Sequence, residues 1–231
     1  GVFSIVNGSK EIVEEICDHP EIKAIAFVGS SNVAKTVYSR STSKGKRALC
    51  LGGAKNHMIV VPDADQDSTA KGLLASSMGS AGQRCMAASV ALGVANVDSI
   101  IDQLVDEAKK LKLGVDMGTI INASSLDRIE NYIEESKKMG AKVLIDGRDI
   151  ISPKGFENGF WLGPTILDQV DPDWPCAKEE IFGPVLSIIR TDTLENAMKI
   201  ENANQYGNAA AVFTTSGQVA KTISETASSG M

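Results

Sequence analysis

Residues 22–41 read Ile-Lys-Ala-Ile-Ala-Phe-Val-Gly-Ser-Ser-Asn-Val-Ala-Lys-Thr-Val-Tyr-Ser-Arg-Ser, and this stretch decides the fold. The run over 22–28, apolar except for Lys23, predicts a strand that is buried on both faces, as strands of parallel sheets are. Gly29-Ser30 predicts a sharp turn, after which residues 32–41 are expected to form a helix. A buried strand that leads directly into a helix is the repeating unit of α/β proteins.

The same alternation continues along the rest of the chain. Helices are expected over residues 10–18, 67–78, 100–111, 126–139 and 194–203, and from residue 217 onward. Strands are expected over residues 1–6, 47–51, 57–61, 89–94, 142–145, 160–167, 185–189 and 209–213. Strands that alternate with helices in this way predict an α/β architecture with a mostly parallel sheet.

The composition narrows the possible partners. With 231 residues, of which 43% are hydrophobic, the chain can bury a core in one or two domains. The formal net charge is −6, so no nucleic-acid partner is expected. No apolar run approaches the roughly 18 residues of a membrane span, and no signal-peptide pattern is present. We therefore expect neither a nucleic acid nor a membrane as partner.

The cysteines indicate the redox setting. Cys17, Cys50, Cys85 and Cys176 show no CxxC spacing, and only two histidines accompany them. This pattern argues against a metal site and predicts a reducing, intracellular compartment, either the cytoplasm or the mitochondrial matrix.

Both ends of the chain are typical of a segment taken from a longer polypeptide. The chain begins with Gly1 rather than an initiator methionine, and it stops at Met231 just after a helix, where a further strand is expected. We therefore expect this chain to be part of a longer protein.

The segment Gly79-Ser80-Ala81-Gly82-Gln83-Arg84-Cys85-Met86 holds a candidate nucleophile. Its small residues let another molecule approach closely, and the positive charge of Arg84 favours the thiolate form of a neighbouring cysteine. Cysteine is also one of the residue types most often packed inside proteins. The residues alone therefore leave two interpretations of Cys85, a reactive thiol or a half-buried inert one.

Two further segments allow both a binding and a structural interpretation. At Gly29-Ser30-Ser31, the free N–H groups of the following helix start would favour an anion such as a pyrophosphate, but a serine N-cap alone explains the same residues. In Glu179-Glu180-Ile181-Phe182-Gly183-Pro184, an acid beside an exposed aromatic ring could hold ribose hydroxyls. It could equally be a loop acid paired with a surface lysine.

In their order and separations, these segments resemble the aldehyde dehydrogenase superfamily. Within it, the segments around residues 17–25, 53–57 and 81–87 resemble the methylmalonate-semialdehyde dehydrogenases, which release an acyl-CoA. The segments that carry the wider resemblance are Phe27-Val28-Gly29-Ser30, Leu51-Gly52-Gly53-Ala54-Lys55, Gly82-Gln83-Arg84-Cys85, Lys178-Glu179-Glu180-Ile181-Phe182-Gly183-Pro184 and Tyr206-Gly207-Asn208-Ala209-Ala210-Ala211-Val212-Phe213-Thr214.

The resemblance implies a fold and a division into domains. Residues 1–52 would be the C-terminal part of a Rossmann-like NAD-binding domain. Residues 53–231 would be the catalytic domain, with its thiol nucleophile, truncated at its C-terminus. A homo-oligomer, dimer or tetramer, is implied for the full-length protein. Because the first half of the NAD domain is absent, we expect this chain alone to be inactive.

The resemblance also assigns roles in cofactor binding. The pyrophosphate turn of the family maps onto Gly29 and Ser30, although the second glycine of that turn is Ala34 here. The acid that binds the nicotinamide ribose maps onto Glu180, and the aromatic residue beside the nicotinamide onto Phe182. Gly52 would lie near the nicotinamide through its backbone.

The reacting residues follow in the same way. The catalytic thiol maps onto Cys85, and the resemblance assigns Arg84 to the carboxylate of a semialdehyde substrate. A guanidinium suits bidentate pairing with a carboxylate. The alternative is that Arg84 only favours the Cys85 thiolate or points to solvent.

One departure from the family pattern bears on the reaction. Most aldehyde dehydrogenases carry at the second segment a glutamate that activates water to hydrolyse the acyl-enzyme, and Leu51 stands at that position here. The loss of a general base slows such a step by a factor typically of order a hundred to ten thousand. Coenzyme A carries its own strong nucleophile. The implied reaction is therefore NAD-dependent oxidation of methylmalonate or malonate semialdehyde, with decarboxylation and transfer to coenzyme A as co-substrate. The alternatives are a hydrolytic aldehyde dehydrogenase that releases a free acid, and a non-catalytic scaffold relative.

Overall fold

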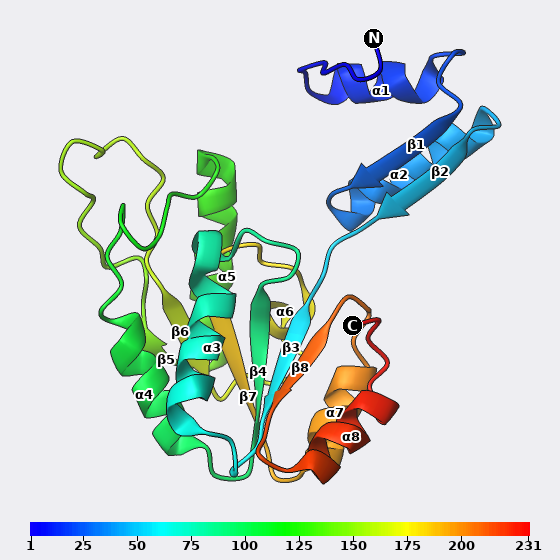
Figure 1. Ribbon diagram of the computed structural model, residues 1–231. Helices are drawn as coiled ribbons and strands as arrows, with labels where there is room; N and C mark the ends of the chain where they lie inside the picture. The colour runs from blue at the N-terminus through cyan, green and yellow to red at the C-terminus, as the bar shows by residue number, and fades with distance from the viewer. The chain divides into compact units, whose positions relative to one another are not determined.

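The first 53 residues form a small parallel strand–helix–strand unit with an additional helix. The computed structural model describes residues 1–231, which divide into two compact units, Gly1–Gly53 and Ala54–Met231 (Figure 1). In the first unit, α1 (Lys10–Asp18) precedes β1 (Ala24–Val28), α2 (Ser31–Ser43) and β2 (Arg47–Leu51). The two strands pair in parallel, with Phe27 opposite Cys50.

Side-chain bonds fix α1 against α2 in this unit. The Arg40 guanidinium donates two hydrogen bonds to the Asp18 carboxylate, with Nε–Oδ1 and Nη2–Oδ2 distances of 3.0 and 2.8 Å. This ion pair holds the pKa of Asp18 below its usual value, chiefly through the hydrogen bonds. Lys46 Nζ donates to the Ile16 and His19 carbonyl oxygens at the end of α1. A cation at that end of a helix is favourable because unpaired carbonyl groups gather there.

Two predictions for this unit were wrong. Residues 1–6 form no strand, and all of them are exposed, so they pack against no layer that would order them. The strand predicted at 22–28 begins only at Ala24, and its residues alternate between half-buried and exposed. Its apolar sequence indicates burial on two faces, but the main helix that packs on β1 and β2 is α2.

The second unit is built on one six-stranded sheet, in the order β5–β6–β7–β4–β3–β8. Neighbouring strands are parallel except for β5 and β6, which are antiparallel. The prediction of an α/β fold with a mostly parallel sheet is therefore confirmed. The strands are β3 (Asn56–Val60), β4 (Ala88–Val94), β5 (Lys142–Ile145), β6 (Thr165–Asp168), β7 (Val185–Thr191) and β8 (Ala210–Phe213).

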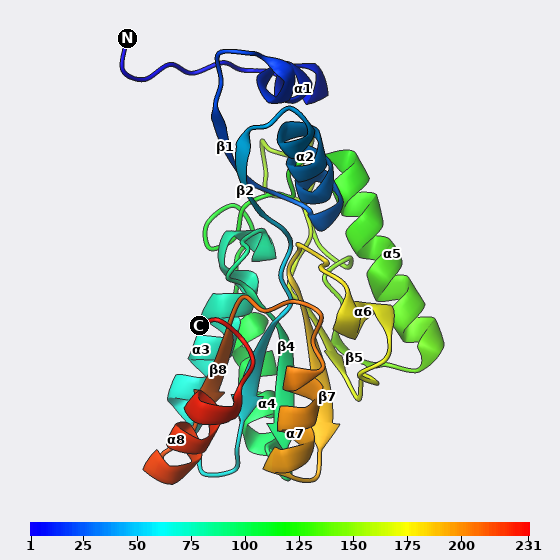
Figure 2. The same cartoon turned by 90° about the vertical axis from the view of Figure 1, so that its right-hand side faces the viewer.

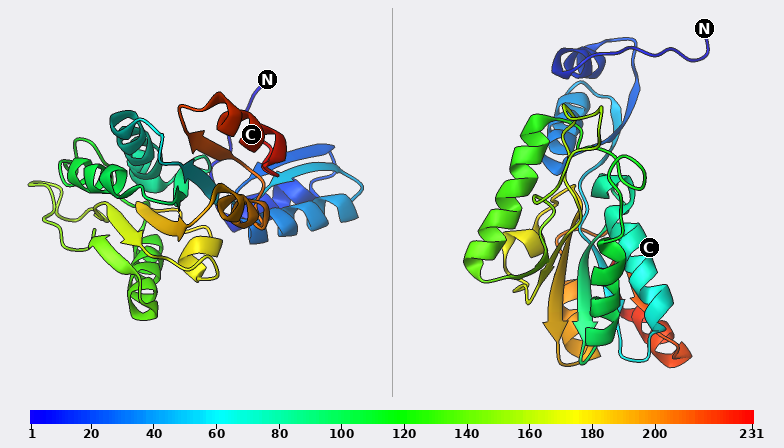
Figure 3. Two further views of the ribbon diagram at one scale, coloured as in Figure 1. Left: turned by 90° about the horizontal axis from the view of Figure 1, so that it is seen from below. Right: turned by 90° about the vertical axis from the view of Figure 1, so that its left-hand side faces the viewer.

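Helices cover both faces of this sheet. Figure 3 shows α3 and α4 on one face and α5, α6 and α7 on the other, and Figure 2 shows α5 beside α6. The helices are α3 (Gln66–Met78), α4 (Asp98–Ala108), α5 (Ala123–Met139), α6 (Pro175–Lys178), α7 (Leu194–Asn202) and α8 (Gly217–Thr226). The core lies between these layers and is formed by fully buried side chains such as Ile59, Leu73, Leu92, Leu104 and Ile188.

Most predicted elements are present, and the shifted ends have local causes. The helix expected from residue 126 begins at Ala123, because the Asn122 side chain accepts a hydrogen bond from the Ser125 N–H at 2.8 Å and caps it. The strand expected from residue 160 begins only at Thr165, directly after Pro164. Proline cannot donate to a strand ladder, so it marks where the strand can start. No helix combines the length and the apolar character needed to cross a membrane.

Candidate active site

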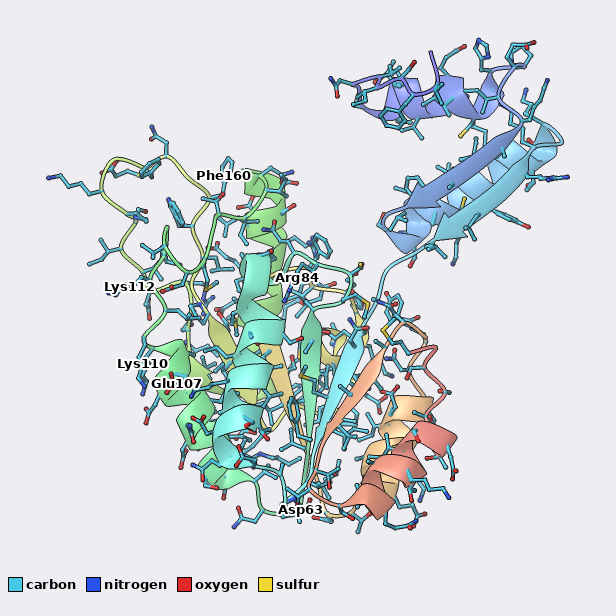
Figure 4. The ribbon with its side chains drawn as sticks, viewed as in Figure 1. Asp63, Arg84, Glu107, Lys110, Lys112 and Phe160 are labelled. Atoms are coloured by element: carbon cyan, nitrogen blue, oxygen red, sulfur yellow. The ribbon has the colours of Figure 1, made fainter.

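The predicted site residues Cys85 and Phe182 lie at one edge of the second unit's sheet, together with two asparagines. Cys85 precedes β4, Phe182 precedes β7, Asn208 precedes β8, and Asn56 is the first residue of β3. Because these four strands are parallel, their amino ends meet at the same edge. Asp63, which follows β3, lies at the opposite end of the sheet (Figure 4). Folding therefore places residues from four distant parts of the sequence side by side.

The loop before Cys85 is held in an unusual backbone conformation. A short 3-10 turn, η1 (Gly79–Gly82), follows α3, and three of its residues are left-handed, with φ of 53° at Ser80, 52° at Ala81 and 68° at Gly82. For residues with a side chain, this conformation costs of order 1 kcal/mol or more each and persists only where the surroundings impose it. The loop therefore stores strain directly before the predicted nucleophile.

Cys85 is exposed and carries a free thiol. Its carbonyl oxygen accepts hydrogen bonds from two asparagine side chains, Asn56 Nδ2 at 2.8 Å and Asn208 Nδ2 at 2.9 Å. Asn56 Nδ2 also donates to the Ala87 carbonyl oxygen at 2.9 Å. The residue is thus not packed as an inert half-buried thiol would be, and its backbone is fixed while the sulfur remains accessible.

Arg84 is anchored to the end of α3 (Figure 4). Its Nη2 donates to the carbonyl oxygens of Ala75 and Ser76 at 3.0 and 2.8 Å. These carbonyls belong to the last turn of the helix, where a cation is favourable. One side of the guanidinium is thus bonded to the helix through Nη2. Because Arg84 is exposed, Nη1 and Nε are left for another partner.

The second acid of the Glu179–Glu180 pair faces the same edge. Glu180 Oε1 accepts a hydrogen bond from the Ala54 N–H at 3.0 Å, so its partner is a backbone amide and not a surface lysine. Glu179 accepts a hydrogen bond from the Tyr132 hydroxyl. Arg128, one turn before Tyr132 on α5, donates from Nη1 to the Glu180 carbonyl oxygen at 3.4 Å. One face of α5 therefore holds both acidic residues in place.

Phe182 also has a strained backbone. Its φ of 54° is left-handed, which is a rare conformation for a bulky residue, and 39% of the residue remains exposed. The following Gly183 packs against α5, where a Cβ atom would lie 2.6 Å from the Ile129 side chain. The turn is thus pinned on one side, and an aromatic ring is presented at the surface on the other.

Four predicted site residues of this unit share one small hollow. Arg84, Cys85, Glu180 and Phe182 line it together with Ala54, Gly82, Ala87, Ala88, Ser89, Ile181 and Gly183. Glu180 is the one carboxylate among these residues, and no histidine is among them. The structure therefore brings together a free thiol, a carboxylate, a guanidinium and an aromatic ring.

The other predicted residues belong to the first unit. Ser30 occupies the N-cap position of α2, but its side chain makes no capping hydrogen bond, so a serine cap does not explain this turn. Gly52 lies against Ser31, where a Cβ atom would stand 2.9 Å from the Ser31 hydroxyl oxygen. That hydroxyl accepts a hydrogen bond from the Gly53 N–H at 3.1 Å. Gly29 precedes Ser30 at the end of β1.

A family model confirms what the motifs indicate. The model of the aldehyde dehydrogenase family matches residues 1–231. The chain belongs to the aldehyde dehydrogenase family. It is 46% identical over 227 residues to the bovine (Bos taurus) methylmalonate-semialdehyde/malonate-semialdehyde dehydrogenase [acylating], mitochondrial; the match covers 96% of this chain and 42% of that protein.

Solved structures agree with this assignment. The methylmalonate-semialdehyde dehydrogenase of Oceanimonas doudoroffii superposes with a TM-score of 0.91 at 39% identity, over 95% of this chain and 46% of that one. A Sinorhizobium meliloti 1021 protein solved in complex with NAD gives a TM-score of 0.91 at 42% identity, with the same coverage of 95% and 46%. This aldehyde dehydrogenase chain thus spans less than half the length of these relatives.

One residue of the aldehyde dehydrogenase chain was missed as a site candidate by the sequence analysis. Lys55 is buried, and its Nζ atom has no hydrogen-bond partner. Burial lowers the pKa of the Lys55 ammonium to about 8, partly offset by electrostatic interactions with Cys176, Glu180 and Glu179. Lys55 appeared in the sequence only as part of the second family segment. A lysine two residues before the strand predicted at 57–61 was the available signal.

Asn56 and Asn208 were also missed as contacts of Cys85. Both lie within the family segments, but asparagine beside a glycine-rich turn is ordinary. Their contact with Cys85 depends on the order of strands in the sheet, which the sequence does not specify.

Proposed function

We propose that the complete polypeptide containing this chain oxidises methylmalonate or malonate semialdehyde with NAD and transfers the acyl group, after loss of carbon dioxide, to coenzyme A. The observation that carries this proposal is the exposed Cys85 in one hollow with Glu180 and Phe182. The names of the relatives support the substrate and the acceptor.

The residues of each unit suit a nicotinamide dinucleotide. In the first unit, Ser30 leaves the first amide groups of α2 without a side-chain cap, and such amides favour a pyrophosphate. In the second, Glu180 uses Oε1 for the Ala54 amide and has a second oxygen for a ribose hydroxyl, beside the exposed ring of Phe182. When bound, NAD supplies the acceptor for the hydride that leaves the substrate carbon. We assign residues 1–52 to the NAD domain and 53–231 to the catalytic domain on this basis.

The Cys85 thiolate forms a carbon–sulfur bond with the aldehyde carbonyl, and loss of hydride from that carbon leaves a thioester. The β-carboxylate then departs as carbon dioxide. The thiol of coenzyme A then displaces Cys85 from the acyl carbon. The proton that this thiol loses balances the proton that the α-carbon takes up after decarboxylation. Arg84, through Nη1 and Nε, binds the substrate carboxylate until it departs.

Leu51 supports a thiol acceptor over water, because an aliphatic side chain cannot accept a proton. It lies at the end of β2 and is 52% exposed. The test is NADH formation by the complete polypeptide from malonate semialdehyde, with and without coenzyme A. We expect a single burst without acceptor and sustained turnover with it. Cys85→Ser abolishes the burst, whereas the control Cys50→Ser leaves it intact. An unchanged burst in Cys85→Ser would exclude this role.

A hydrolytic aldehyde dehydrogenase is the second candidate. One observation favours it, since Glu180 is a carboxylate in the same hollow as Cys85 and could activate water. Sustained turnover without any thiol would establish this reaction instead. The family resemblance also supports a homo-oligomer, dimer or tetramer, which light scattering of the complete polypeptide would measure.

A further inference from the structure

The carbonyl group of Cys85 is held by two side chains from outside the nucleophile loop. Its oxygen accepts Asn56 Nδ2 at 2.8 Å and Asn208 Nδ2 at 2.9 Å. A carbonyl oxygen has two lone pairs, so both acceptor positions are filled. The peptide plane between Cys85 and Met86 therefore cannot rotate without losing two hydrogen bonds.

The two donors come from neighbouring strands. Asn56 begins β3, and Asn208 lies just before β8. These strands pair in parallel with His57 opposite Ala210, so the two asparagines reach the loop from the same end of the sheet. Asn56 is buried and also holds the Ala87 carbonyl, whereas Asn208 is half-buried and also donates to Met86 Sδ at 3.2 Å. Asn56 thus bonds the backbone on both sides of Met86, and Asn208 adds a second donor to the Cys85 carbonyl oxygen.

Such a clamp is needed because the preceding residues are strained. Ser80 and Ala81 are left-handed and would relax to ordinary conformations if the loop were released. Gln83 holds the other flank, since its Nε2 donates to the Thr119 carbonyl at 3.0 Å and its Oε1 accepts from the Ile121 N–H at 2.9 Å. Cys85 itself is exposed, so the packing of its side chain contributes little to holding it. Its position depends on these backbone anchors.

We propose that Asn208, together with Asn56, is a positioning residue for Cys85, which it holds through the Cys85 carbonyl in the orientation required for attack on the substrate. This inference rests on the proposed function only in taking Cys85 as the nucleophile. Asn208 touches neither the sulfur nor the substrate carbon in this assignment. A misplacement of about 1 Å at a reacting atom can cost about a hundredfold in rate.

The test compares Asn208→Leu with Asn202→Leu in the complete polypeptide. Leucine matches asparagine in shape but cannot donate. Asn202 is a matched control, because its Nδ2 also donates to a backbone carbonyl, that of Thr226 at 3.0 Å, in a different part of the unit. The readouts are amide hydrogen exchange of the peptide covering residues 79–87, the rate of the NADH burst, and KM for the semialdehyde.

We expect Asn208→Leu to speed amide exchange in residues 79–87 and to slow the burst about tenfold to a hundredfold, with KM changed less than twofold. Asn202→Leu should change neither. Unchanged exchange, or faster exchange with an unchanged burst, would overturn the inference. Absence of any burst in the unsubstituted enzyme, with exchange still faster in Asn208→Leu, would remove the proposed function while leaving the clamp on the loop established.

Discussion

Gly82 and Gly183 lie in backbone contact, so close that a Cβ atom on Gly82 would stand 2.1 Å from the Gly183 carbonyl oxygen. The contact joins the loop that carries Cys85 to the loop that carries Glu180 and Phe182. Neither loop can shift without displacing the other, because backbone meets backbone and no flexible side chain lies between them.

Gly82→Ala should therefore be severely destabilising. It adds a clash with the backbone of Gly183 to the cost of a left-handed alanine, about 1 to 2 kcal/mol. Gly45→Ala is the matched control, since Gly45 has a similar φ of 72° and nothing within 4 Å of its Cβ position. Thermal denaturation should show a much larger loss of Tm for Gly82→Ala. Equal losses would show that the loops separate freely.

Lys55 should make stability depend on pH in the alkaline range. Burial lowers the pKa of Lys55 from 10.5 to about 8, so between these values the unfolded chain binds more protons than the folded one. The free energy of unfolding should then rise with pH across this window, by about 3 kcal/mol in total.

Lys55→Met should remove this rise and increase stability at pH 7, because it removes the unpaired amine from the interior. Urea denaturation at pH 7, 8, 9 and 10 measures both effects. The exposed Lys221, substituted as Lys221→Met, is the control. If the curves of Lys55→Met and the unsubstituted protein ran parallel, the amine would not be buried in solution.

Tyr132→Phe should weaken cofactor binding without abolishing it. The hydroxyl of Tyr132 donates to Glu179, and burial together with this bond raises the pKa of Tyr132 well above its usual value. Loss of the donor frees Glu179 and loosens the adjoining Glu180. We expect KM for NAD to rise several-fold and stability to fall by about 1 kcal/mol. Tyr38→Phe, at an exposed position of α2, should change neither. An unchanged KM would show that Glu180 is held without α5.

Arg84→Met separates the two roles of this guanidinium. Loss of the bonds to Ala75 and Ser76 should lower Tm slightly, by the loss of about 1 kcal/mol at the end of α3. If Nη1 and Nε bind the substrate carboxylate, KM should rise more than tenfold for malonate semialdehyde but hardly at all for propionaldehyde, which has no carboxylate. Equal changes for both aldehydes would leave Arg84 with the helix contact alone.

The sequence predicted the elements well where local signals decide them. The helix at 10–18 and the strands at 47–51 and 142–145 have the predicted bounds. It failed where a neighbour decides, because an apolar run does not reveal whether a second layer covers it, as β1 shows. The late start of β6 has a local signal, Pro164, since proline cannot donate within a strand ladder.

For the site, the motifs supplied the residues but not their contacts. Cys85 and Glu180 were identified, and the structure places them in one hollow. The bonds from Asn56 and Asn208 to Cys85 span 29 and 123 residues of sequence. Such contacts follow from which strands become neighbours, and that order is a property of the whole sheet. The buried amine of Lys55 is hidden for the same reason, since a lysine in sequence is ordinarily expected at the surface.

Because β3 pairs with β8, the contacts of Cys85 can be completed only late in synthesis of the chain. As the ribosome releases the protein from its N-terminus, Cys85 and Asn56 emerge long before Asn208. Until Asn208 has been synthesised, the Cys85 carbonyl oxygen lacks one of its two hydrogen-bond donors. A product that terminates before Asn208 therefore contains Cys85 without the hydrogen bond from Asn208.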